Sequence, residues 1–235
     1  MRLLTDHAMP EGGATMKPLM SSLVVPVIAL ALAAQAQADP GAGAALFNDQ
    51  GCMECHYTEG PSKEKTIDDQ LAKTGPELWY AGSKFQMPWL VAWLQDPQPI
   101  RPLKYNSINE PNPENHPALG PQEAADIADF LMGLTSDVVE TGVIEPKKKD
   151  RKARLLFAKD QPCGACHQYP AKRKVKGGLS GPSLVGASAR LNPDWIYAYL
   201  LRPEVFKPIK MMPVFRNVLS EEQMRQIAAY VAAFK

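Results

Sequence analysis

Every cysteine of this 235-residue chain lies in one of two five-residue strings, Cys52-Met53-Glu54-Cys55-His56 and Cys163-Gly164-Ala165-Cys166-His167. Each string places two thiols at a fixed spacing and follows them directly with an imidazole. The backbone of each string must therefore bring two sulfurs and one ring to a common point. Few folds meet that demand twice, so the strings limit the possible folds more than any other feature of the sequence.

The sequence after the first string is repeated after the second. Gly75-Pro76-Glu77-Leu78 corresponds to Gly181-Pro182-Ser183-Leu184, and Trp89 then aligns with Trp195 without a gap. The same register pairs four further positions: Ala81 with Ala187, Ala92 with Ala198, Leu94 with Leu200, and Pro97 with Pro203. Internal repeats of this length indicate duplicated structural units. We expect two homologous domains, residues 39–138 and 151–235, joined by a polar linker over residues 139–150.

Helical patterns dominate both halves, and neither half shows a strand-like alternation of any length. Apolar periodicity predicts helices before each cysteine pair, after each Gly-Pro-x-Leu and at the end of each half. The expected ranges are 42–48, 89–95 and 123–131 in the first half, and 152–159, 194–201 and 221–234 in the second. The predicted fold class is all-α.

Cys-x-x-Cys-His is the attachment signature of c-type haem. The two thiols form thioethers with one porphyrin, and the histidine that follows lies beneath the iron as its proximal ligand. A zinc site would have to bring the distant ligands together, and a redox disulfide would require a βαβ setting that is absent here. We therefore predict two covalently bound c-type haems, attached at Cys52 and Cys55 and at Cys163 and Cys166, with His56 and His167 on the irons.

Both halves resemble class I cytochrome c domains over nearly all of residues 39–235. The shared pattern is a helix, Cys-x-x-Cys-His, Gly-Pro-x-Leu, a helix that ends near a proline, an axial methionine loop and a final helix. The resemblance implies a small helical bundle around one haem in each half. It also implies that the carbonyls of Pro76 and Pro182 orient His56 and His167, which would fix the tautomer of each proximal ligand.

The second half carries Met211-Met212-Pro213, where class I domains place their axial methionine, commonly before a proline. The resemblance therefore implies Met212 as the sixth ligand of the second haem, with Met211 as the alternative. A core methionine with no ligand role is the remaining interpretation. Methionine and histidine together raise the potential of a haem iron.

The first half has a histidine where the second half has Met212. After Pro97 its segment is ten residues longer, from Gln98 to Asn115, and it ends at His116-Pro117 opposite Met212-Pro213. We predict His116 as the sixth ligand of the first haem. Met87 is the main alternative, although it stands at the start of its expected helix. An open sixth position is the third, and it would suit a haem enzyme (a peroxidase or a sulfur-compound oxidase) or a gas or redox sensor.

The N-terminal 38 residues carry the features of an export signal. Lys17 precedes a largely apolar run over residues 19–34, and Ala36-Gln37-Ala38 is a small-x-small cleavage site. Met16 is the better initiator, because residues 1–15 are polar and acidic. We expect cleavage after Ala38 and a periplasmic protein; an uncleaved membrane anchor is the alternative, although the apolar run is short for a span.

Charge is divided unequally between the two halves. Residues 39–140 hold 16 acidic and 6 basic residues, net −10, whereas residues 141–235 hold 7 acidic and 18 basic, net +11. Opposite fields of this size would steer different partners. We expect redox proteins as electron donor and acceptor, a soluble chain, no nucleic acid, and an anionic membrane surface as an open alternative. The predicted function is electron transfer, as a soluble carrier or as the cytochrome subunit of a dehydrogenase, with no catalytic residue.

Overall fold

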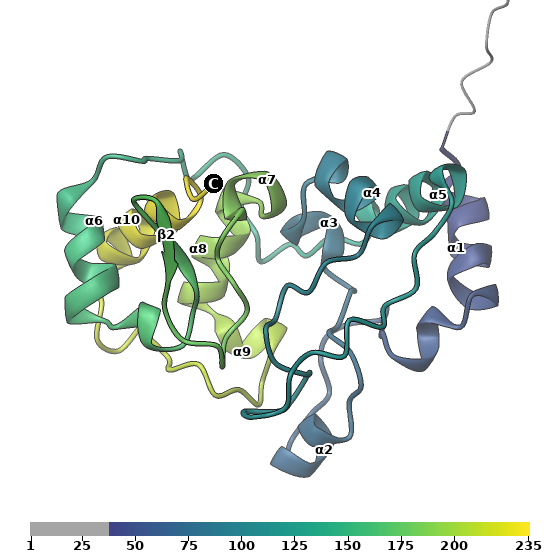
Figure 1. Cartoon of the computed structure of the whole chain (residues 1–235), viewed down its shortest axis with the longest axis horizontal. Coiled ribbons are helices and arrows are strands. Elements are labelled where there is room, and N and C mark those ends of the chain that lie inside the picture. The colour runs from purple at the N-terminus through teal and green to yellow at the C-terminus, as the bar shows by residue number, and fades with distance from the viewer. Residues whose placement is uncertain (1–37) are drawn as a thin grey trace, which may run out of the picture. The chain divides into compact units, whose positions relative to one another are not determined.

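The computed structural model describes residues 38–235 (Figure 1). The predicted leader therefore lies outside the described residues, apart from Ala38. Among residues 38–235, no helix combines the length and hydrophobicity that a membrane crossing needs.

The first half begins with α1 (Pro40–Asp49), whose start is fixed by Asp39, since the Asp39 carboxylate accepts hydrogen bonds from the backbone N–H groups of Gly41 and Ala42. The helix packs against the last helix of the same half, α5 (Pro121–Met132). Between them lie four shorter helices: the 3-10 helix η1 (Cys52–Glu54), α2 (Ile67–Leu71), α3 (Ala81–Lys84) and α4 (Met87–Gln95).

The second half repeats this order. The helix α6 (Arg151–Leu155) continues into the π-helical turn η2 (Leu156–Asp160), and the 3-10 helix η3 (Cys163–Ala165) follows. The helices α7 (Ala187–Arg190), α8 (Pro193–Leu201) and α9 (Pro203–Phe206) precede the closing helix, α10 (Glu221–Val231). Ser220 and Gln223 form a capping box that starts α10. In both halves the first helix packs against the last, which encloses the core.

The close approach of α1 and α5 depends on Gly43. A side chain at this position would collide with the Asp126 carbonyl on α5. The corresponding residue in the second half is Ala153, which is completely buried. The buried rings of Phe47 and Phe157 follow at the same spacing from these two small residues. Phe157 is nevertheless one residue farther from its cysteine pair, and the π-helical turn accommodates this extra residue.

A short hairpin departs from the all-α prediction. Tyr169–Ala171 (β1) pairs antiparallel with Lys174–Lys176 (β2), immediately after the second Cys-x-x-Cys-His string. Each strand has three residues, too few for an alternating pattern to stand out in the sequence, and Lys172 lies in the left-handed region at the turn. The fold is therefore mostly helical with one small sheet, and the all-α prediction was wrong at this point.

The segment expected as a linker is held by a buried carboxylate. The N–H groups of Gly142, Val143 and Ile144 all donate to Asp194 at the start of α8, over 2.7 to 3.0 Å. Farther along, the Lys147 N–H donates to the Ala229 carbonyl of α10. These bonds attach the segment to the second half, so it is not a free tether.

The two halves contact each other through matched positions of the repeat, and residues 38–235 belong to one compact unit. Gln86 N–H donates to the Arg190 carbonyl, and Asn192 N–H donates to the Lys84 carbonyl, at 3.0 and 2.8 Å. Lys84 corresponds to Arg190 in the repeat, and Gln86 corresponds to Asn192. The side chains follow the same rule: Lys84 lies over the ring of Trp195, and Arg190 lies over that of Trp89.

Candidate haem-binding sites

Each histidine of the two strings is held by the Gly-Pro turn of its own half. His56 Nδ1 lies 2.8 Å from the Pro76 carbonyl oxygen, and His167 Nδ1 lies 2.7 Å from that of Pro182. A carbonyl only accepts hydrogen bonds, so each Nδ1 carries the proton and each Nε2 keeps a free lone pair. That lone pair is what a metal ligand requires.

The four cysteines lie on the short helices η1 and η3 and just after them. None forms a disulfide; Cys52 and Cys163 are half-buried, and Cys55 and Cys166 are exposed. Burial raises the pKa of Cys52 and brings that of Cys163 to about 11. Over residues 38–235, no three His, Cys, Asp or Glu side chains converge to hold a metal ion. The zinc and redox-disulfide interpretations therefore lack support.

A cavity of about 90 Å³ adjoins the first string. Cys52, His56 and His116 all line it. The rest of its wall is almost entirely apolar, and includes Phe47, Leu78, Phe85, Leu90, Leu94, Ile100, Ile127 and Leu131. An apolar wall with a few polar groups that converge on it is typical of a cofactor site.

His116 shares this cavity with His56. The two ring centroids lie 6.2 Å apart, with the ring planes inclined by 45°. The ring of His116 packs against Trp93 at 4.7 Å, and its Nδ1 lies 3.0 Å from the Pro117 carbonyl, which leaves Nε2 free. A metal bound by two imidazoles puts the centroids roughly 6 Å apart, from two bonds of about 2 Å and two ring radii of about 1.2 Å. The spacing in the cavity matches that value.

The three methionines named from the sequence lie in different surroundings. Met87 opens α4 and packs against the core, but it is not among the residues that line the cavity of His56 and His116. Met212 is half-buried against the core of the second half. Met211 is 68% exposed, so its thioether projects into solvent. Burial therefore favours Met212 over Met211, and cavity position favours His116 over Met87.

The pKa of each of the three histidines is lowered, in every case mainly by burial. At His56 the bond to Pro76 opposes this effect, while the charges of His116 and Lys84 add to it. At His167 the bond to Pro182 opposes it and the charge of Arg101 adds to it. For His116 burial again outweighs the bond to Pro117. All three rings are thus kept neutral near pH 7, the form that binds metal.

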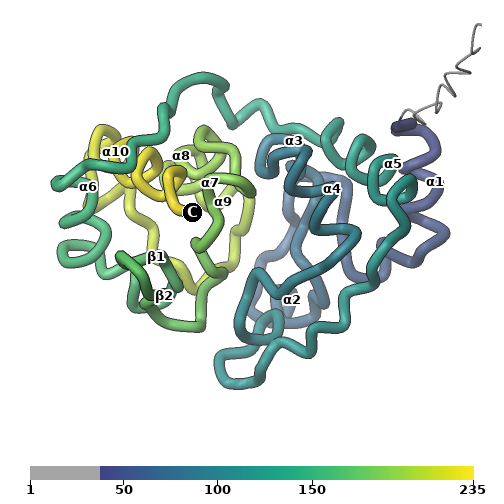
Figure 2. Tube along the Cα trace, turned by 45° about the horizontal axis from the view of Figure 1, so that its top comes forward, coloured from purple at the N-terminus to yellow at the C-terminus, as the bar shows by residue number. Residues whose placement is uncertain are grey.

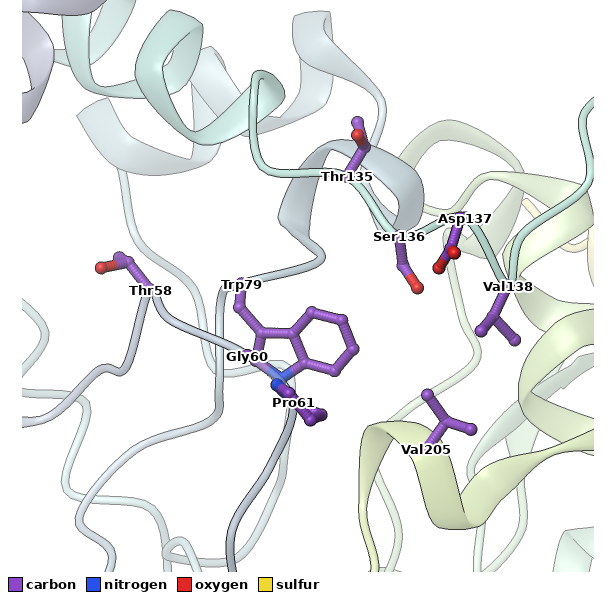
Figure 3. A pocket seen from close by; sticks show the side chains of 9 residues that line it. All are labelled: Thr58, Gly60, Pro61, Trp79, Thr135, Ser136, Asp137, Val138 and Val205. Carbon is purple, nitrogen blue, oxygen red and sulfur yellow. The ribbon is translucent and has the colours of Figure 1, made fainter.

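A second hollow, of about 410 Å³, extends from Thr58 and Trp79 of the first half to Val205 of the second (Figure 3). Figure 3 shows the indole of Trp79 projecting into it, with Val138 and Val205 on the opposite side. Its lining contains no cysteine, histidine or methionine. The hollow is larger in free volume than the cavity of His56, but it offers no group that could attach or ligate a haem.

Comparison with known families agrees with this geometry. Residues 41–135 match the family model of cytochrome c, and residues 149–231 match that of cytochrome c oxidase, cbb3-type, subunit III. The chain contains two tandem class I cytochrome c domains. This is the resemblance expected from its motifs. A search of curated proteins found no matching relative.

Cytochrome c domains imply covalently bound haem, and the residues of both sites fit it. In the first domain, Cys52 and Cys55 would form the thioethers and His56 would bind the iron beside the apolar cavity. In the second, Cys163, Cys166 and His167 repeat this arrangement, down to the bond with a proline carbonyl. A side chain at Gly181 would collide with the His167 ring, which explains the glycine of the Gly-Pro turn.

Several contributors to the sites were not predicted from the sequence. Trp93 packs on His116, and Ile100 and Arg101 extend from the first domain to the Gly-Pro turn of the second. The helical spacing of Trp89 and Trp93 could have placed both rings on one face of α4. Ile100 and Arg101 could not have been found in this way, because their partners lie about 80 residues away.

Proposed function

We propose that this cytochrome is a periplasmic dihaem protein that transfers electrons between redox partners. The observation that carries the proposal is the pairing of His56 and His116 at 6.2 Å beside free cysteines in an apolar cavity. This arrangement suits an iron with both axial positions filled, which can exchange electrons but has no vacant position for a substrate. When bound, each haem supplies one-electron redox chemistry.

In each domain, different residues would attach the haem, orient its proximal histidine and supply its sixth ligand. The cysteines anchor the group, and the Pro76 and Pro182 carbonyls hold the proximal imidazoles in one tautomer and orientation. The apolar wall of the first cavity excludes water, which strengthens the electrostatic interactions between groups inside it. His116 and Met212 are the proposed sixth ligands.

Different sixth ligands would give the two domains different potentials. A methionine ligand raises the potential of a haem iron relative to a second imidazole. The first domain would then be the lower-potential site, so electrons are expected to enter at the acidic domain and leave from the basic one. The opposite net charges of the halves, −10 and +11, would steer different partners to each.

The proposed location follows from the leader-like sequence at residues 16–38 and from the attachment chemistry, which in bacteria takes place outside the cytoplasm. Both a free carrier and a cytochrome subunit of a larger oxidoreductase fit the two domains. The likeness of residues 149–231 to subunit III of an oxidase supports the subunit arrangement. An enzyme or gas sensor would need an open iron, and the position of His116 argues against one in the first domain.

Haem content tests the proposal directly. Purified protein should give two c-type haems per chain in a pyridine haemochrome assay, and both should survive acid–acetone extraction. The double substitution Cys163→Ala, Cys166→Ala should leave one. A single haem in the unsubstituted protein, or haem that can be extracted, would contradict the proposal.

A further inference from the structure

The segment of the first domain between Pro97 and His116 reaches the second haem-binding site. Within this segment, Gln98–Asn115, the Ile100 carbonyl accepts a hydrogen bond from Ser183 N–H over 2.8 Å. The next residue, Arg101, donates from Nη2 to the Ser180 carbonyl, also over 2.8 Å. These two bonds attach to either side of the Gly181-Pro182 turn.

That turn holds the proximal histidine of the second domain. The Pro182 carbonyl accepts the hydrogen bond of His167 Nδ1, and Gly181 lies so close to the His167 ring that no side chain fits between them. Any displacement of the turn must therefore move the imidazole or weaken its hydrogen bond. Partners that orient a metal-bound histidine in this way tune the metal itself.

The same segment is anchored at the first site. The side chain of Ile100 lines the cavity of His56 and His116, so one residue contacts the wall of the first site and the proximal turn of the second. Farther along, Asn106 donates to the carbonyls of Gln70 and Lys73 at the end of α2. Figure 2 shows this long segment running beside α2. These bonds hold the segment in place.

Arg101 brings a positive charge to the second site. Its side chain is half-buried, and no carboxylate within residues 38–235 forms an ion pair with it. Its Nε atom is buried without a partner. Oxidation of a haem iron adds positive charge, which a nearby cation in a poorly solvated place disfavours. The reduced state is thereby stabilised, and the midpoint potential rises.

We propose that Arg101 is a positioning residue through which the first domain raises the midpoint potential of the second haem. It does so by holding the Gly181-Pro182 turn and by placing its charge beside it. The inference rests on the proposed function, because it requires a haem on His167. It gives the segment Gln98–Asn115 a role beyond that of carrying His116.

Potentiometric titration of the holoprotein tests the role of Arg101. The weak far-red band of an iron–methionine bond reports the second haem alone, so its disappearance on reduction gives that haem's midpoint. Arg101→Gln should shift this midpoint downward and leave that of the first haem unchanged. Arg101→Lys, which keeps the charge, should recover most of the shift. Arg151→Gln, an equal change of charge at an exposed residue of α6, should leave both midpoints as they are.

The outcomes separate this inference from the proposed function. A wild-type protein without a second haem, or without the far-red band, would overturn the proposed ligation itself. If the far-red band is normal but the midpoint of the second haem is the same in Arg101→Gln as in the wild type, only the role of Arg101 is overturned. An equal shift in the midpoints of both haems would also overturn only that role. If Arg101→Gln does not assemble with two haems, Arg101→Met, uncharged and similarly long, takes its place with the same expected shift.

Discussion

The imidazoles of His56 and His116 lie 6.2 Å apart in one apolar cavity, each with Nδ1 engaged by a proline carbonyl. With both Nε2 atoms free, the pair is suited to close an iron from two sides. His116→Ala should therefore open the first haem, give a high-spin EPR signal, and allow carbon monoxide to bind one haem of every two. Carbon monoxide titration of the reduced protein measures this stoichiometry.

Met87→Ala is the matched control for this prediction. Because Met87 does not line the cavity, its removal should leave carbon monoxide binding as low as in the unsubstituted protein. Carbon monoxide binding by the wild-type protein at one haem, or opening by Met87→Ala alone, would refute His116 as the ligand.

Met212 is half-buried and Met211 is exposed, which predicts opposite results for two adjacent substitutions. Met212→Ala should abolish the far-red band of the oxidised protein completely and lower the midpoint potential of the second haem. Met211→Ala should retain the band at full strength. A visible spectrum of each oxidised variant decides between them, and the reverse pattern would move the ligand by one residue.

The hairpin β1–β2 presents a cluster of exposed cations, Lys172, Arg173, Lys174 and Lys176, beside the second string. If this cluster docks an acidic partner, the rate of electron transfer should fall several-fold between about 0.01 and 0.15 M salt, as the screening length drops from about 30 to 8 Å. Lys174→Glu with Lys176→Glu should remove most of this dependence in stopped-flow measurements. Lys63→Glu with Lys65→Glu, exposed on the first domain, serves as the control and should preserve it.

Lys84 lies over the rings of Tyr80, Phe85 and Trp195, and burial, with the charges of Arg190 and Lys207, lowers its pKa from 10.5 to about 7. Between pH 7 and 10.5 the Lys84 amine is protonated in the unfolded chain but neutral in the folded chain. Burying this amine therefore lowers the free energy of unfolding by its full amount below pH 7, and has no such effect above about pH 10.5. Cation–π attraction to the rings offsets part of it.

Lys84→Met should therefore stabilise the protein by roughly 1–3 kcal/mol at pH 7 and by little at pH 10.5. Denaturant unfolding at both pH values measures the difference. Lys104→Met, at a lysine whose side chain is 56% exposed, should show no such change with pH. A Lys84→Met effect that is equal at both pH values would contradict the lowered pKa.

Local patterns in the sequence predicted much of the structure. The Cys-x-x-Cys-His strings, the Gly-Pro turns and the helical periodicities each involve residues that are near neighbours in the chain, and the repeat supplied an independent check on each helix. The opposition of His116 and His56 could be predicted only because the repeat aligned His116 with Met212.

Features that depend on distant partners could not be predicted. The attachment of Gly142, Val143 and Ile144 to Asp194 involves a carboxylate 50 to 52 residues away, in a segment whose composition resembles a loop. The bond from Ser183 to Ile100 crosses between domains and uses only backbone atoms, so side-chain identity carries no trace of it. The hairpin at Tyr169 was missed because each strand is only three residues long.

The matched contacts between the halves have a consequence for the symmetry of the molecule. Gln86 bonds to Arg190 as Asn192 bonds to Lys84, and the cation of each half lies over the tryptophan of the other. Reciprocal contacts of this kind are the mark of a two-fold axis between identical subunits. The two halves therefore meet as the subunits of a symmetric dimer would, although they belong to one polypeptide. Because both halves are parts of one chain, matched positions can differ: His116 stands in one half where Met212 stands in the other.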